Sequence, residues 1–200
     1  MFQSLGACAF AVPTPVFLVG SYDSAGKANI MTAAWGGICA SQPPCLSVSI
    51  AKARWTHAAI QSRNAFTVSI PSRDQVAQAD FAGMYSGRSE DKFATLGFTP
   101  TAAEHVDAPY VAECPVVIEL RLTHSLELGS HTQFIGEIMD VKVHAHCLDA
   151  KGTPLLNRID PLLFIPQARQ YWSVGNLVAR ALSVGRSVDK KALIGDSPHR

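Results

Sequence analysis

The chain has 200 residues, of which 48% are hydrophobic and 16% are charged. This balance predicts one domain with a full apolar core and excludes an intrinsically disordered chain. The formal net charge of +1 gives no electrostatic reason to expect nucleic acid as a partner. We expect no membrane association, because no apolar run reaches the roughly 18 residues of a spanning helix. The first residues lack the basic region of a signal peptide.

The five cysteines are odd in number and form no CxxC motif. A disulfide framework or a zinc site is therefore not expected. The sequence predicts reduced, mostly buried thiols in a cytoplasmic protein.

Apolar and polar residues alternate with a period of two in several segments, which is typical of strands with one face on a core. Leu46, Val48 and Ile50, for example, alternate with Ser47 and Ser49. In chain order, this pattern and the turns between the segments predict strands over residues 15–22, 28–35, 45–51, 65–70, 116–128, 133–149 and 162–165.

Helices are predicted between some of these strands. One covers residues 56–63 with Thr56 as its N-cap, and another follows a capping box formed by Ser72 and Gln75. A shorter helix over residues 89–97 is expected to begin at Ser89 and to end at Gly97. A final amphipathic turn or two is expected at Leu177, Val178, Ala181 and Leu182.

Strands joined mainly by hairpins, with a few helices between them, predict a mainly β protein built on a closed antiparallel barrel. Residues 1–200 are expected to form a single domain, with a C-terminal helical extension at about residues 175–200. No GxGxxG or Walker sequence supports a nucleotide-binding unit of the α/β type. No GxSxG or other nucleophilic motif points to hydrolysis.

The segment ANIMTAAWGGI, residues 28–38, combines small residues with one large aromatic side chain. A core strand normally carries bulk, whereas Thr32, Ala33 and Ala34 leave room beside Trp35. This pattern indicates that a ligand fills the space.

A second segment, Arg54-Trp55-Thr56, lies between a strand and a helix N-terminus, where free N–H groups and the helix dipole attract anions. Arg54 can bind a phosphate with two parallel hydrogen bonds. An ordinary N-cap beside a solvated arginine explains the residues about as well.

Other candidates are weaker from the residues alone. Lys92 stands at a helix start, where a cation opposes the dipole, so it either serves a ligand or is a solvated surface lysine. His131 lies two residues after Gly129, at a strand start, and can donate a hydrogen bond to a ligand. His144 and His146 share one strand face, and their role as structural or tuning residues stays open.

Several segments, in this order, resemble the flavin reductase-like family with an FMN-binding split barrel, and within it the flavoredoxin branch. The similarity runs from about Pro15 to Arg186. It is carried by NIMTAAW, RWTHAAI, SGRSEDKF, GSHTQFIGEI, LLFIPQARQYWSVG and LVARALSVGR. The resemblance implies a six-stranded antiparallel Greek-key split barrel, a tightly bound FMN and a homodimer with its FMN sites near the subunit interface.

The resemblance also assigns cofactor-binding positions. Those expected to let the flavin ring approach the backbone, or to pack beside it, are Asn29, Met31, Thr32, Ala33, Ala34 and Trp35, with Ser49 and Ile50 as neighbours. Those expected at the phosphate are Arg54 and Thr56. Lys92 and His131 are expected to touch the cofactor, where a cation or an N–H donor near the ring raises its reduction potential. Phe164 and Tyr171 match a segment that closes over the site.

Three functions remain open at this point. The first is an FMN-dependent electron-transfer protein that exchanges electrons with redox protein partners. The second is an NAD(P)H-dependent flavin reductase, although many family members that use a nicotinamide carry aspartate where this chain has Ser130. The third is a split barrel that binds a ligand without redox chemistry. Whether the protein is an enzyme, and what its electron donor and acceptor are, stays undecided.

Overall fold

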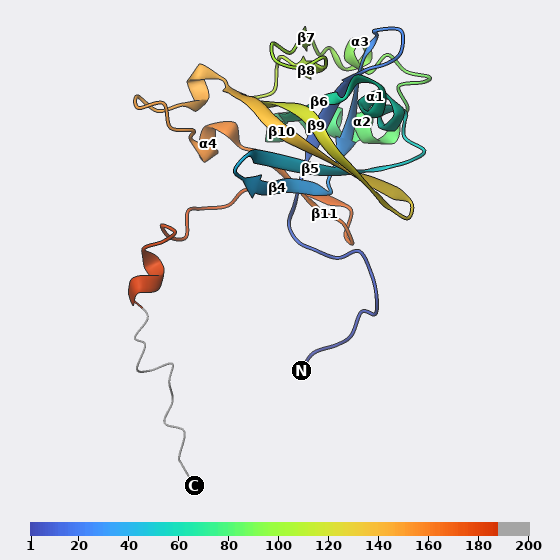
Figure 1. Cartoon of the computed structure of the whole chain (residues 1–200). Helices are drawn as coiled ribbons and strands as arrows, with labels where there is room; N and C mark the ends of the chain where they lie inside the picture. The colour runs from blue at the N-terminus through green and yellow to red at the C-terminus, as the bar shows by residue number, and fades with distance from the viewer. Residues whose placement is uncertain (188–200) are drawn as a thin grey trace.

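A seven-stranded antiparallel sheet forms the body of the protein in the computed structural model, which describes residues 1–187 (Figure 1). The strands are ordered β3-β2-β6-β9-β10-β5-β4. Their bounds are β2 Phe17–Tyr22, β3 Ala28–Ala33, β4 Gly36–Ser41, β5 Pro44–Ala51, β6 Ala65–Ile70, β9 Val116–Leu128 and β10 His131–Val143. The prediction of a mainly β protein with a few helices is confirmed.

The expected six strands and the closed barrel are wrong. Residues Gly36–Ser41, which begin with two glycines, form the additional edge strand β4 and pair with β5. Strands β3 and β4 lie at opposite ends of the sheet, although only Ala34 and Trp35 separate them in sequence. In the described part of the chain no β ladder joins these two edges, so the curled sheet stays open there.

Two smaller sheets complete the β structure. One contains β1 Thr14–Pro15, β11 Leu162–Ile165 and β12 Gln170–Ser173, in the order β1-β11-β12. The other pairs β7 Pro100–Ala102 with β8 Pro109–Val111. The first sheet packs near helix α2, because Tyr171 of β12 bonds to Asp80 of that helix.

The helices are α1 Trp55–Arg63, α2 Val76–Met84, α3 Lys92–Leu96 and α4 Leu156–Ile159. Figure 1 shows α1, α2 and α3 grouped around one part of the sheet. One apolar cluster lies within the curl of the sheet and includes Phe66, Leu120 and Phe134. A second includes Leu18 and Ile30 of the sheet together with Ala79 of α2 and Phe93 of α3. Burial of these side chains holds the helices against the sheet.

Two predicted helix starts are wrong. Arg54 is the N-cap of α1, and Thr56 lies inside the helix, 1% exposed. The Thr56 hydroxyl accepts a hydrogen bond from the buried Asn29 amide, which needs a partner away from water. Helix α3 begins at Lys92 rather than near Ser89, because the Asp91 carboxylate caps the N–H of Ala94 at 3.2 Å.

Other local predictions are confirmed. The capping box at Ser72 and Gln75 is present, with the Ser72 N–H donating to Gln75 Oε1 at 2.9 Å. Gly97 ends α3 with a φ of 67°, a left-handed conformation that favours glycine.

The strand predicted over residues 133–149 is too long at its C-terminal end. Strand β10 ends at Val143, and Ala145–Cys147 is a 3₁₀ helix, so His144 and His146 do not share a strand face. Their rings instead lie 5.4 Å apart, outside any strand.

Beyond residue 175, the described residues contain one 3₁₀ helix, Val184–Ser187. The remainder of the expected C-terminal extension, residues 188–200, lies outside the described residues. None of the helices in residues 1–187 is long and apolar enough to cross a membrane. All five cysteines of the chain lie in this range, and all are free thiols.

Candidate functional site

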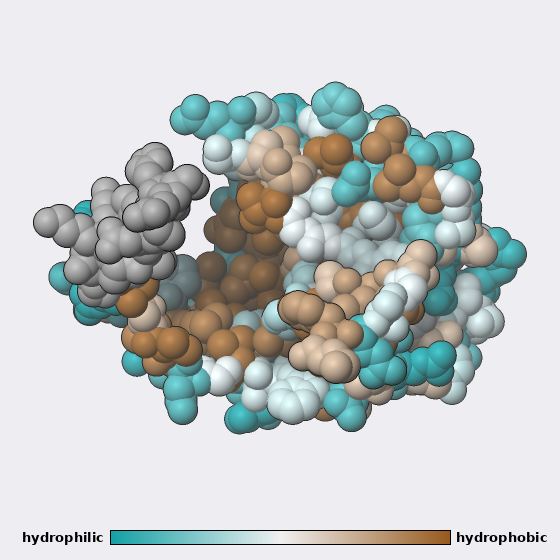
Figure 2. Space-filling model, turned by 90° about the horizontal axis from the view of Figure 1, so that it is seen from below, coloured by the Kyte–Doolittle hydropathy of each residue, from teal (hydrophilic) through white to brown (hydrophobic). Residues whose placement is uncertain are grey.

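A cavity of about 670 Å³ lies beside the edge strand β3. Strand β3, the Ala34–Trp35 link, helix α2 and the β11–β12 hairpin contribute to its wall. Ten of the predicted site residues line it: Met31, Thr32, Ala33, Ala34, Trp35, Ser49, Arg54, His131, Phe164 and Tyr171. Figure 2 shows apolar residues gathered in a hollow on the face from which both terminal segments leave.

Small residues at the end of β3 make room for this cavity. Ala33 and Ala34 carry only a methyl group each, and the Thr32 hydroxyl donates to the carbonyl of Ala79 on α2. Trp35 is 42% exposed, and its ring centroid lies 4.9 Å from that of His131. An aromatic ring and small aliphatic groups around a cavity suit a planar apolar ligand.

A second cavity of about 90 Å³ adjoins the first, because Met31 and Arg54 line both. It contains the three predicted site residues Asn29, Thr56 and Lys92. Among the fourteen predicted site residues, Ile50 alone lines neither cavity, since its side chain is 1% exposed and belongs to the apolar core.

Hydrogen bonds fix the polar wall of this small cavity. Asn29 Nδ2 donates to Thr56 Oγ1 at 3.0 Å. Lys92 Nζ donates to the carbonyl oxygens of Ile30 at 2.8 Å and Ala82 at 2.7 Å. Gly87 completes the wall, because a Cβ at this position would collide with the Asn29 amide oxygen. The small cavity thus depends on a glycine that the sequence pattern alone did not single out.

Positive charge collects around the small cavity. Burial, together with the Arg54 guanidinium, lowers the pKa of Lys92 from 10.5 to about 8. Arg88 lies over the Trp55 ring, 5.1 Å from its centroid, and Trp55 lines the same cavity. The first turn of α1 contains no acidic residue to offset the helix dipole. Cations and a helix N-terminus together favour an anion here.

The β11–β12 hairpin closes the large cavity on another side. Phe164 and Tyr171 are cross-strand partners whose ring centroids lie 5.4 Å apart. The Tyr171 hydroxyl donates to Asp80 Oδ1 of α2 at 2.9 Å. Burial and the Asp80 carboxylate raise the pKa of Tyr171 above its ordinary value, so the phenol keeps its proton and the bond to Asp80.

At the Ser130 position, the serine hydroxyl lies 2.8 Å from His131 Nδ1. A hydrogen bond there orients the imidazole at the cavity wall. Serine therefore supplies a neutral partner for the ring where an aspartate would supply a charge.

Sequence reasoning missed about half of the lining. Those missed in the large cavity are Val16, Ala51, Asp80, Gly83, Met84, Pro166 and Arg169, and those missed in the small one are Ala53, Trp55, Ala82, Tyr85, Ser86 and Gly87. Most of the α2 residues have no chemical signal in the sequence, because which helix face meets a cavity depends on packing. The SGRS segment was a usable signal for Ser86 and Gly87.

No group of three or more His, Cys, Asp or Glu side chains suited to a metal ion occurs in residues 1–187. The two adjoining cavities instead suit a molecule with a planar ring system at one end and an anionic group at the other. Flavin nucleotides have this shape and charge distribution.

The comparisons with known proteins agree with this geometry. The model of the flavin reductase like domain matches residues 9–173, and the chain therefore belongs to that family. Flavoredoxin of Desulfovibrio vulgaris (Miyazaki F) is 57% identical, with a TM-score of 0.89 over 92% of this chain and 100% of that one. Flavoredoxin from Methanosarcina acetivorans is 31% identical, with a TM-score of 0.88 over 94% and 98% of the two chains. The expected similarity to the flavoredoxin branch is confirmed.

Among curated proteins, NADH:riboflavin 5'-phosphate oxidoreductase of Streptomyces pristinaespiralis is 28% identical over 140 residues, which is 70% of this chain and 77% of that protein. The first curated relatives are matched over less than two thirds of their own length, namely 65%, 64% and 43%.

Proposed function

We propose that the two adjoining cavities bind one FMN molecule, with its ring system in the large cavity and its phosphate in the small one. This proposal is supported by the cluster of Arg54, Lys92 and the α1 N-terminus at a cavity that adjoins the apolar one. The cofactor expected here is FMN. The small cavity of about 90 Å³ is lined by one cluster of cations, which matches the single phosphate of FMN.

Each wall residue has a part in this arrangement. Arg54 neutralises the phosphate, and the Lys92 ammonium, held by two carbonyls, adds positive charge close by. The backbone at Thr32, Ala33 and Ala34 admits the ring system closely because no large side chain intervenes. Trp35 and His131 pack at its open side. A flavin held in this way supplies reversible transfer of one or two electrons.

The protein then acts as an electron-transfer protein of the flavoredoxin type, with redox proteins as donor or acceptor. This proposal is supported by the 57% identity and full coverage of the flavoredoxin from Desulfovibrio vulgaris. The 42% exposure of Trp35 also leaves the wall of the cavity accessible from outside the chain. The free thiols of all five cysteines suit a reducing cytoplasm.

An NAD(P)H-dependent flavin reductase is the second candidate, favoured by the relative from Streptomyces pristinaespiralis. Ser130 argues against it. Rapid mixing of the FMN-loaded protein with NADH or NADPH separates the two functions. Electron transfer between proteins predicts slow loss of the oxidised flavin absorption in the absence of a protein partner. Rapid loss would establish the reductase.

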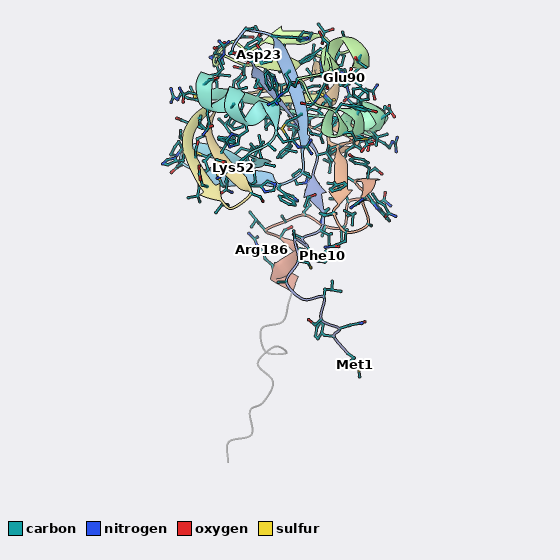
Figure 3. All side chains as sticks on the ribbon, turned by 90° about the vertical axis from the view of Figure 1, so that its right-hand side faces the viewer. Met1, Phe10, Asp23, Lys52, Glu90 and Arg186 are labelled. Carbon is teal, nitrogen blue, oxygen red and sulfur yellow. The ribbon has the colours of Figure 1, made fainter. Side chains whose placement is uncertain are left out.

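A homodimer is part of the proposal, because the terminal segments carry apolar side chains that the chain itself leaves in water. Phe2, Leu5, Phe10 and Val12 are between 49% and 107% exposed. Figure 3 shows Met1 and Phe10 in a segment that extends away from the body. Burial of such side chains against a second copy is favourable. Sedimentation velocity of the FMN-loaded protein is expected to show a dimer, and a monomer with tightly bound FMN would contradict this part.

The visible absorption spectrum of the purified protein tests the cofactor proposal, followed by identification of the molecule that heat releases. A flavin spectrum with released FMN is expected. Released FAD would contradict the assignment to FMN. A colourless protein that takes up no added FMN would favour a split barrel without redox chemistry.

A further inference from the structure

Arg169 lies in the turn between β11 and β12 and lines the large cavity but not the small one. Its backbone has a φ of 52°, in the left-handed region that non-glycine residues rarely adopt. A residue with a positive φ is common in such hairpin turns, and the exposed Arg169 side chain lines the cavity from this turn.

The hairpin that carries Arg169 is anchored beside helix α2. Tyr171, two residues further on, donates to Asp80 Oδ1 at 2.9 Å, and its ring packs on Phe164. These contacts keep the turn at the cavity wall. They also engage the carboxylate of Asp80, which is the acidic residue of the cavity lining.

The charges around the large cavity do not balance. Arg54 and Arg169 line it, and neither forms an ion pair with a carboxylate anywhere in residues 1–187. Arg54 adjoins the small cavity and is accounted for by the phosphate of FMN. Arg169 has no such role, because it lies in the β11–β12 turn and does not line the small cavity.

We infer that Arg169 forms a second anion-binding subsite, which selects a small redox partner molecule bearing a carboxylate or phosphate group. This inference rests on the proposed binding of FMN, since it concerns the molecule that binds beside the flavin ring. The large cavity of about 670 Å³ must hold both the flavin ring and this second molecule, which binds where Arg169 lines the wall. A guanidinium at its wall can hold a carboxylate or phosphate by two parallel hydrogen bonds.

Equilibrium binding to the oxidised, FMN-loaded protein tests the inference without relying on turnover. The probes are naphthalene-2-carboxylate and its neutral isostere naphthalene-2-carboxamide, measured by isothermal titration calorimetry. The carboxylate is expected to bind about tenfold more tightly, as a charge-assisted hydrogen bond predicts. Adenosine 5'-phosphate and adenosine form a second pair of probes. The pair with the larger preference for its anionic member shows whether the subsite selects a carboxylate or a nucleotide phosphate.

Arg169→Asn is the informative variant, because asparagine tolerates a positive φ and removes the charge. It is expected to abolish the preference for the anionic probe, whereas Arg169→Lys retains part of it. Arg121→Gln is the matched control, since Arg121 is an exposed arginine of β9 that pairs with Glu137 and lines neither cavity. The control is expected to keep the full preference.

The content of FMN, measured by absorption, separates this inference from the proposed function. Arg169→Asn is expected to retain FMN. Loss of FMN in this variant would overturn the inference by making Arg169 part of the flavin site. Equal binding of the charged and neutral probes by the wild-type FMN protein would also overturn it. A wild-type protein that binds no FMN would instead refute the proposed function.

Discussion

The side-chain amide of Asn29 donates a 3.0 Å hydrogen bond to the hydroxyl oxygen of Thr56, which ties strand β3 to the first turn of helix α1. Both side chains are buried, at 6% and 1% exposure, and both line the small cavity. The bond connects the strand that bounds the large cavity to the helix terminus beside Arg54. The bond thereby fixes the position of the large cavity relative to the small one.

Removal of the Thr56 hydroxyl should destabilise the protein while its shape is kept. Thr56→Val leaves the buried Asn29 N–H without this acceptor, so the free energy of unfolding is expected to fall by about 1–3 kcal/mol. Urea denaturation of the FMN-free protein measures the change. Thr56→Ser, which keeps the hydroxyl, serves as the control, and equal stability of the two variants would show that the hydrogen bond contributes little.

Gly87 is expected to tolerate no side chain. Gly87→Ala places a Cβ against the Asn29 amide oxygen, so either the loop or Asn29 must move. We expect a loss of about 1–3 kcal/mol in stability, together with weaker FMN binding. Gly83→Ala is the milder comparison, because its Cβ would lie 3.2 Å from the Thr32 Cβ. Fluorescence titration should give a lower affinity for FMN in Gly87→Ala than in Gly83→Ala. The reverse order would count against a rigid small cavity.

The buried Lys92 predicts a particular dependence of stability on pH in the FMN-free protein. Its pKa is lowered by burial and by Arg54, from 10.5 to about 8. Between these values the unfolded chain binds more protons than the folded one, so the contribution of Lys92 to stability rises with pH. Below about pH 8 both states carry the proton, and the contribution is flat.

Urea denaturation at about pH 7.5 and about pH 10 measures this slope. Lys92→Met, which cannot titrate, should remove the part of the rise that belongs to this residue. Bound FMN should reduce the rise, because the phosphate favours the charged ammonium. The same slope in wild type and variant would mean that Lys92 keeps an ordinary pKa.

Trp35 is expected to contribute packing to the bound flavin. Trp35→Ala should weaken FMN binding by about tenfold, in line with the loss of an aromatic contact. Trp172→Ala is the control, because Trp172 is 58% exposed and lines neither cavity. Equilibrium dialysis of both variants gives the comparison. An equal effect of the two substitutions would remove Trp35 from the site.

Much of the strand framework could be predicted from the sequence, because alternation reports directly on which face of a strand is buried. The predicted strands over residues 65–70, 116–128 and 162–165 coincide with β6, β9 and β11. Strand β4 was missed because Gly36 and Gly37 are typical of turns and its exposed side chains carry no alternation. Pairing with β5 holds this strand in place, and a long-range contact of that kind leaves no local pattern.

The candidate site, like the fold, could be predicted from the sequence only in part. Residues with distinctive chemistry, such as Arg54, Trp35 and His131, were found from the sequence and its family resemblance, and they line the cavities. Asp80 and Arg169 were missed, because each reaches the large cavity only through the packing of the β11–β12 hairpin on α2. The caps of α1 and α3 were misplaced for a related reason. The Thr56 hydroxyl is buried and bonds to Asn29 of a distant strand, so it does not cap the helix.

The dissociation constants of FMN and of riboflavin, measured for the wild-type protein and for Arg54→Ala, test whether the small cavity holds the phosphate of FMN. The two ligands share the ring system and differ in the phosphate. We expect Arg54→Ala to weaken the binding of FMN by about 10- to 100-fold, because a charge-assisted hydrogen bond is lost. The affinity for riboflavin should change by about twofold or less. An equal loss of affinity for both ligands would contradict the assignment of the small cavity to the phosphate.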